Sequence, residues 1–157
     1  MRGAGTNKGF STLEVLTAVA IVVILAMILL GVGRRLKTQA DEKLARSTIE
    51  ILVTAISQYH QFWEEFPTVD LAELPIKHSE DLYEQLYSTP DSRRLCEQIQ
   101  ATQIGDTSES PNGDLEFLDP WGNPLDYRYS EGDSFPVVES GGADGELDTT
   151  GDNISSR

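Results

Sequence analysis

The 157-residue chain is poor in cysteine, histidine and basic side chains, and each shortage excludes a class of structure or function. A single cysteine, Cys96, excludes an internal disulfide. The two histidines, His60 and His78, stand in separate parts of the sequence without the spacing of zinc ligands. No nucleophile clusters with a base in the sequence, so we expect a protein that is not an enzyme.

Basic residues are scarcest in the last part of the chain. Residues 67–157 hold 5 basic and 20 acidic side chains, a net charge of −15, whereas residues 1–66 have a net charge of +1. Nucleic acids and anionic lipid surfaces repel such an acidic domain, so we expect no nucleic-acid partner. The acidic groups would suit a divalent cation, although a solvated acidic surface explains most of them.

The longest uncharged run, Val15–Gly33, predicts a membrane-spanning helix. Its 19 residues would rise roughly 28 Å as a helix, about the thickness of the hydrocarbon core of a bilayer. Basic residues at 34–37 close the run and can reach the headgroups. A cleaved secretory signal is the alternative, but the Ala-x-Ala at Ala18–Ala20 lies inside the run, so a retained anchor is favoured.

One acidic residue, Glu14, stands at the start of this run. A carboxylate in lipid costs on the order of 2.5 to 3.5 kcal/mol, so Glu14 needs either a cationic partner or an interfacial position. A cut between Gly9 and Phe10 would create an α-amino group about one helical turn from Glu14. Neighbouring subunits could then pair amine with carboxylate.

The stretch Lys8–Leu16, Lys-Gly-Phe-Ser-Thr-Leu-Glu-Val-Leu, resembles the class III leader of type IV prepilins and of type II secretion pseudopilins. The resemblance implies that residues 1–9 are a leader cut after Gly9 by prepilin peptidase. It also implies that Phe10 is methylated and that Glu14 acts in assembly. It places the N-terminus in the cytoplasm, whereas the count of basic residues on each side of the run would favour the opposite orientation.

Beyond the membrane, apolar residues recur at three- and four-residue spacing, which predicts that the same helix continues. It should run from near Phe10 to about Glu65 and end before Pro67, because proline lacks the amide that continues a helix. The apolar stripe includes Tyr59 and Trp63. We expect it to form the face on which a globular domain packs.

The predicted layout is therefore a leader at 1–9, a transmembrane half of the helix at 10–33, a periplasmic half at 34–66 and an acidic globular domain at 67–157. About 90 residues in that domain leave room for one small core. Within it, Ser79 can cap one short helix.

A second short helix can begin at Pro90 and run through Ile99. Cys96 is expected to be a small buried residue of that helix. After the turn sequence Asp119–Asn123, alternating residues predict a half-buried strand at 125–129, with Leu125, Tyr127 and Tyr129 inward and Asp126 and Arg128 outward. A turn and a second strand should follow around 135–139, and Trp121 is expected to pack against the long helix.

The segment Leu118–Tyr127, with Glu139–Gly145 and Gly151–Ile154, resembles the C-terminal half of the G-type major pseudopilin of type II secretion. In that family the loop near the C-terminus binds calcium through aspartate side chains and main-chain carbonyls. The resemblance implies a ligand set of the Asp144, Asp152 and Asn153 side chains and the Gly141 and Thr150 carbonyls, with Asp148 as a substitute.

Such a Gly-rich loop can turn several oxygens toward Ca²⁺, which takes six to eight of them, although the spacing is not that of an EF-hand. The cofactor expectation is therefore calcium.

Together the two resemblances imply an α+β, type IV pilin-like fold: a long N-terminal helix, short helices, a small antiparallel sheet and a calcium-type loop. They imply a major pseudopilin in the inner membrane, single pass, with its domain in the periplasm. Processed subunits would form a homopolymer through the N-terminal helix, with minor pseudopilins and an inner-membrane assembly platform as partners. This periplasmic pseudopilus would serve type II protein secretion across the outer membrane.

Other interpretations stay open. The nearest is a type IV pilin or a minor pseudopilin of another machine, and a DNA-uptake pilin is disfavoured by the acidic domain. A membrane-anchored periplasmic enzyme would need a catalytic cluster that the sequence does not offer. A calcium-binding module tethered by an uncleaved anchor would retain Met1.

Overall fold

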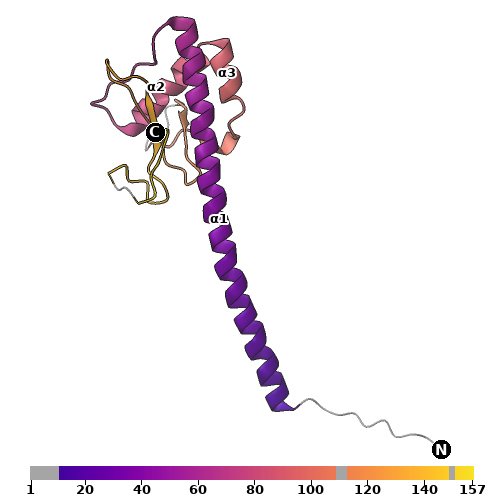
Figure 1. Ribbon diagram of the computed structural model, residues 1–157. Helices are drawn as coiled ribbons and strands as arrows, with labels where there is room; N and C mark the ends of the chain where they lie inside the picture. The colour runs from indigo at the N-terminus through magenta and orange to yellow at the C-terminus, as the bar shows by residue number, and fades with distance from the viewer. Residues whose placement is uncertain (1–10, 109–112, 149–150) are drawn as a thin grey trace, which may run out of the picture. The chain divides into compact units, whose positions relative to one another are not determined.

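A computed structural model describes residues 11–108, 113–148 and 151–157, without the side chains of residues 29–34. The predicted leader and Phe10 lie outside these residues. The chain forms two compact units, Met1–Gln39 and Ala40–Arg157. Helices and short antiparallel strands occupy separate stretches of the sequence, which confirms the α+β class (Figure 1).

The first and longest element is α1, Thr12–Trp63, a helix of 52 residues. It confirms that one helix continues far beyond the uncharged run and ends close to the predicted Glu65. The helix stops because Glu64 adopts a left-handed backbone conformation, with φ of 60°. The Glu64 amide still donates to the His60 carbonyl at 2.8 Å, which closes the last turn.

In the second unit, one stripe of α1 is buried at the predicted spacing. Its fully buried apolar members are Ala45, Ile49, Leu52, Ala55 and Ile56. These positions recur every three or four residues, so they lie on one face of the helix.

The last part of α1 is covered less than the sequence predicted. Tyr59 is partly buried and packs against the core, as expected. The expectation that Trp63 belongs to the core is wrong, because Trp63 is 52% exposed and its neighbour Phe62 is 60% exposed. Within the described part of the chain, Ile56 is the last buried apolar residue of α1, so the final two turns extend past the fully buried core.

Two short helices follow, α2 (Pro75–Tyr87) and α3 (Pro90–Cys96). Each begins with proline in its first turn, where the missing amide costs nothing. The prediction that Ser79 caps a helix is wrong, because α2 starts earlier and Ser79 lies buried inside it. The Ser79 hydroxyl instead accepts from the Phe117 amide at 2.9 Å and donates to the Phe117 carbonyl at 3.0 Å. Helix α3 is three residues shorter than predicted.

The strands form two small antiparallel sheets. After the 3₁₀ helix η1 (Ala101–Gln103), one sheet pairs β1 (Ile104–Gly105) with β2 (Glu116–Phe117). The other has the order β3-β4-β5, with strands Asp126–Arg128, Val137–Ser140 and Ile154–Ser155. The predicted hairpin is confirmed as β3 and β4, in which Tyr127 faces Val138 across the pair. Strand β5 was not predicted.

A single apolar cluster joins α1, α2 and both sheets. Its largest fully buried side chains include Phe117 and Tyr127, and Trp121 is partly buried against it. The buried Tyr127 hydroxyl donates to the Pro67 carbonyl at 2.8 Å and so ties the segment after α1 to β3. Thr48 on α1 donates to the Gln103 side chain at 2.9 Å. These bonds satisfy polar groups that burial would otherwise leave without partners.

Candidate functional site

The predicted assembly residue Glu14 lies in the first turn of α1. A negative side chain is favourable there because the unpaired amides of a helix N-terminus carry partial positive charge. Its backbone amide donates to the Ser11 carbonyl at 2.9 Å. Within the described residues the Glu14 carboxylate forms no ion pair, and the residues predicted for cleavage and methylation, Gly9 and Phe10, lie outside them.

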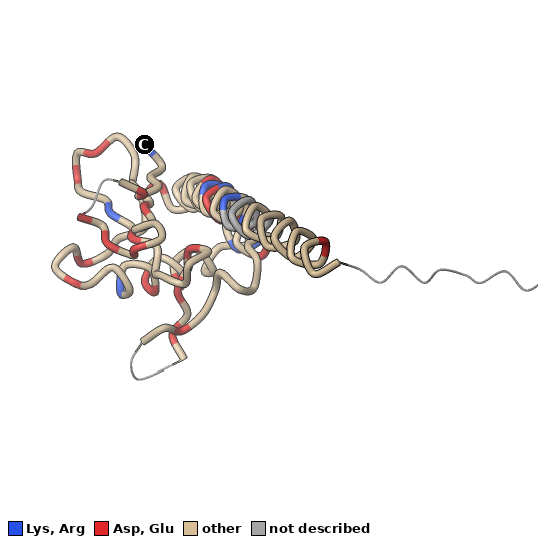
Figure 2. Tube along the Cα trace, turned by 90° about the horizontal axis from the view of Figure 1, so that it is seen from below, with Lys and Arg blue, Asp and Glu red and all other residues tan. Residues whose placement is uncertain are grey.

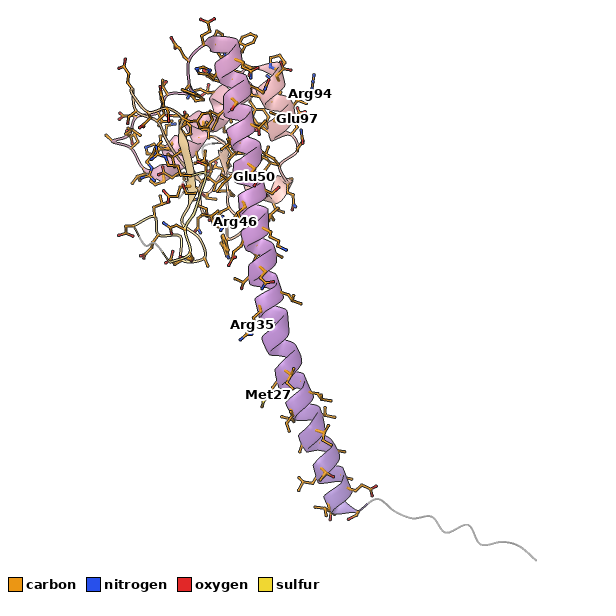
Figure 3. All side chains as sticks on the ribbon, viewed as in Figure 1. Met27, Arg35, Arg46, Glu50, Arg94 and Glu97 are labelled. Carbon is orange, nitrogen blue, oxygen red and sulfur yellow. The ribbon has the colours of Figure 1, made fainter. Side chains whose placement is uncertain are left out.

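The part of α1 that follows Glu14 presents apolar side chains on all sides. Large hydrophobic residues from Leu13 to Ile28 are 45% to 67% exposed. Met27 is among the most exposed and projects away from the helix (Figure 3). Such a surface is far more apolar than an isolated soluble helix normally presents to water.

Across the described residues, we find no helix that combines the length and apolarity required to cross a membrane. The side chains at positions 29–33 of the predicted span lie outside the described residues.

The C-terminal loop, residues 141–153, connects β4 to β5 and holds the residues expected to bind calcium. Its first two glycines, Gly141 and Gly142, are buried where the start of the loop lies against later residues of the same loop. A Cβ on Gly141 would lie 2.6 Å from the Gly145 carbonyl carbon, and one on Gly142 would lie 2.5 Å from the Asp152 carbonyl oxygen. Gly142 also has φ of 69°. Only glycine permits both the close approach and this backbone conformation.

The side chains of the C-terminal loop point largely at its own amides. Asp152 Oδ2 accepts from the Ala143 amide at 2.8 Å and from the Asp144 amide at 3.4 Å. Asp144 Oδ1 accepts from the Glu146 amide at 3.0 Å. The structure therefore brings the Asp144 and Asp152 segments together, as the predicted site requires.

Asn153 is the residue of this loop whose surroundings most favour a bound cation. Its Nδ2 donates to the Leu147 carbonyl at 3.1 Å, while its Oδ1 is buried with no hydrogen-bond partner among the described residues. A buried oxygen without a partner costs on the order of 1 to 3 kcal/mol, so a bound cation or water would relieve it. Thr150 lies outside the described residues, and Asp148 is exposed in the same loop.

The available donors are all oxygens, which suits Ca²⁺ rather than zinc. In the part of the chain that is described, no group of three or more His, Cys, Asp or Glu side chains could hold a metal ion. A calcium site here would therefore depend on main-chain and amide oxygens as well as on carboxylates.

A buried carboxylate that the sequence did not single out anchors this loop. Asp119 is 1% exposed, and its Oδ1 accepts from the amides of Trp121 and Asn123, both at 2.9 Å. Its Oδ2 accepts from the Ser140 hydroxyl at 2.7 Å, and that hydroxyl accepts from the Gly142 amide at 3.0 Å. Asn123 Nδ2 also donates to the Gly142 carbonyl at 3.2 Å. The Asp-Pro-Trp-Gly-Asn turn thus holds the start of the C-terminal loop.

A second buried polar network centres on His78, which is 4% exposed. Its Nδ1 lies 2.7 Å from Asp126 Oδ1 and its Nε2 lies 3.0 Å from the Asp70 carbonyl oxygen. Both partners are acceptors, so both bonds form only when the ring is doubly protonated. Arg128 Nε lies 3.0 Å from Asp126 Oδ2, and its guanidinium also pairs with Glu139.

This network corrects the expectation that Asp126 faces solvent. Asp126 is 3% exposed, and it pairs both with the buried His78 and with Arg128, whose side chain is 48% exposed. Cys96 is buried at the end of α3, as expected, and burial raises the pKa of its thiol to about 12. At neutral pH the reactive thiolate is therefore suppressed.

Acidic residues are distributed along the loops of the second unit (Figure 2). Comparison with protein-family models, with curated proteins and with solved structures returned no match for this chain.

Proposed function

We propose that this chain is the subunit of a filament of the type IV pilin class, most like the major pseudopilin of type II secretion. Prepilin peptidase would remove residues 1–9 and leave Phe10, methylated, at the mature N-terminus. The membrane would hold processed subunits until an assembly platform in the inner membrane adds them to a periplasmic pseudopilus. The subunit would act by packing, without making or breaking bonds.

The observation that carries the proposal is the division of α1 into two differently covered halves. Residues 45–56 supply the buried stripe of the second unit, whereas the large apolar residues from Leu13 to Ile28 are all exposed. Burying one such side chain is worth about 1.5 to 3 kcal/mol, so an apolar surface of this extent needs a cover. Lipid before assembly and the helices of other copies after assembly would both provide it.

Glu14 supports the same mechanism. It sits at the exposed start of the apolar half and has no ion-pair partner within the described residues. The α-amino group of a processed neighbour would neutralise it and set the register between subunits. An unpaired Glu14 would oppose burial of the helix end in the filament.

Calcium is a further part of this proposal. Two observations support it: the buried Asn153 Oδ1 has no hydrogen-bond partner among the described residues, and Gly142 lies directly against Asp152 across the C-terminal loop. Asp144, Asp152 and Asn153 would hold the ion with main-chain carbonyls. Its charge would offset the mutual repulsion of acidic groups and fix the loop against the Asp119 turn.

The experiment that tests the proposal is mass spectrometry of the chain purified from membranes of a host that has a prepilin peptidase. A mature N-terminus at Phe10 that carries one methyl group is the expected result. A Gly9→Leu variant in the same host serves as the matched control, and it should retain residues 1–9. An intact Met1 in the natural chain would overturn the filament proposal and favour the tethered module.

A further inference from the structure

A cavity of about 450 Å³ lies at the C-terminal end of α1. We call it the α1-end pocket. Three aromatic rings line it: His60 from the last turns of α1, Phe66 just after the helix and Tyr129 just after β3. Its volume lies within the range of small-molecule and side-chain sites.

The Phe66 ring contacts both of the other rings, and we call the three rings the aromatic wall of the pocket. The Phe66 ring centroid lies 4.2 Å from that of His60 and 4.9 Å from that of Tyr129. Phe66 also contacts Phe135 edge-on, with 5.3 Å between the ring centroids. The core side of the wall is therefore fixed by packing. Ring faces carry negative charge density and attract a cation placed within about 6 Å of them.

The rest of the lining is acidic. Glu64, Glu65 and Glu131 line the same cavity, are exposed, and form no ion pair with any described residue. Among the described residues, no lysine or arginine lines the pocket, and His60 contributes its ring. The carbonyls at the end of α1 add a partial negative charge of roughly half an electron, which again favours a cation.

Glu64 has an energetically unfavourable backbone conformation, with φ of 60°. Among the described residues it is the only non-glycine with positive φ. Glycine is the usual residue just past a helix end because a Cβ in this conformation costs about 1 kcal/mol or more. The chain places a glutamate there instead, and this glutamate lines the pocket beside the aromatic rings.

We propose that the α1-end pocket binds a cationic side chain, an arginine guanidinium, presented by a partner protein. A guanidinium is flat, so it can stack on the aromatic wall while its N–H groups reach two carboxylates. A metal ion fits less well, because it would need six or more oxygens, and no metal-holding group of side chains occurs in the described part of the chain. This site lies at the opposite end of α1 from Glu14 and does not depend on the filament proposal.

The test is an NMR titration of the full chain in detergent micelles with N-acetyl-arginine-N-methylamide. The matched ligand is N-acetyl-citrulline-N-methylamide, which keeps the shape and loses the charge. We expect saturable shifts at residues 60, 66, 68–69 and 129–131 with arginine and little change with citrulline. Equal shifts with both ligands, or none with arginine, would overturn the proposal.

Two variants separate a binding role from a structural one. Glu64→Gln combined with Glu131→Gln should weaken arginine binding about tenfold, as expected for the loss of two charge-assisted contacts. Glu64→Gly should weaken binding as well, yet it should raise the melting temperature because it removes the backbone strain. Glu97→Gln, an exposed carboxylate at the end of α3 (Figure 3), is the control and should leave affinity unchanged. An equal loss in the Glu97 variant would mean a general field effect and no site.

Discussion

The two units of this chain differ in what covers their apolar residues. In residues 40–157 the apolar side chains of the core are buried against one another in one cluster, and buried polar groups pair with one another through hydrogen bonds. In residues 12–39 the described apolar side chains are exposed, and no other described residue buries them. A long helix can serve two environments when its apolar residues change from an all-round distribution to a single stripe.

The largest difference between the two units is expected for a substitution at Glu14. Under the proposed mechanism, Glu14→Gln should abolish filament growth and the export that depends on it, because the amine of a neighbouring subunit would lose its counter-charge. The urea midpoint of the second unit should not move. The measurement is filament yield by electron microscopy, beside Glu42→Gln as an exposed control on the same helix. Normal filaments in the Glu14 variant would refute the pairing.

A matched pair of truncations sharpens the contrast. Leu52→Ala, at a fully buried position, should destabilise the second unit by about 3 kcal/mol through lost burial and a cavity. Leu25→Ala, at a position 55% exposed, should change that stability by less than about 0.5 kcal/mol. Urea unfolding of both variants in micelles, followed by tryptophan fluorescence, measures the difference. Equal losses would mean that the first unit has a self-supporting core.

Calcium tests how self-sufficient the second unit is. Calcium at about one hundred times its dissociation constant should stabilise the folded domain by about 2.7 kcal/mol, because the unfolded chain lacks the site. Asp152→Asn should remove the effect and Asn153→Asp should lower the calcium concentration required, since each changes one ligand charge. Differential scanning calorimetry with and without calcium gives the result. An unchanged melting curve of the natural chain in millimolar calcium would eliminate the site.

The smallest effect is expected at alkaline pH and only in the second unit. Burial raises the pKa of Cys96 from 9.0 to about 12, so the unfolded chain releases this proton first as pH rises. The associated stability is complete below pH 9 and is lost at up to about 1.4 kcal/mol per pH unit above it. Burial also raises the pKa of Tyr87 and Tyr127, whose ordinary value is 10.0.

The window from pH 9 to 10, between these ordinary values, therefore reports mainly on the thiol. Urea midpoints measured across it should fall in the natural chain and stay nearly flat in Cys96→Ala. The same slope in both chains would assign the effect to other groups.

The sequence predicted those helices, hairpins and loops whose formation depends on residues close together in the chain. The extent of α1 followed from apolar spacing and from the position of Pro67, because helix hydrogen bonds join residues four apart. The β3–β4 hairpin followed from its turn residues and alternation. The polar loop that joins β4 to β5 followed from its Gly and Asp content and from the resemblance of its segments.

Long-range partners could not be predicted in the same way. The alternation that placed Asp126 outward gives the side of a strand, and it cannot show that His78, 48 residues earlier, lies against it. Strand β5 has only two residues and forms because β4 offers it a free edge. Trp63 continues the apolar spacing, but it stays 52% exposed because the buried stripe of α1 ends at Ile56.

The sequence by itself determined the long helix, the uncharged half with a single carboxylate at its start, the acidic character of the rest and the glycines of the C-terminal loop. Each of these depends on residues that are neighbours in the chain. Tertiary structure alone decided that Asp119 holds that loop, that His78 is shared between Asp126 and the Asp70 carbonyl, and that three aromatic rings and three glutamates line one pocket near the end of α1. Those arrangements join residues that are far apart in sequence, and only packing of the core brings them within reach of one another.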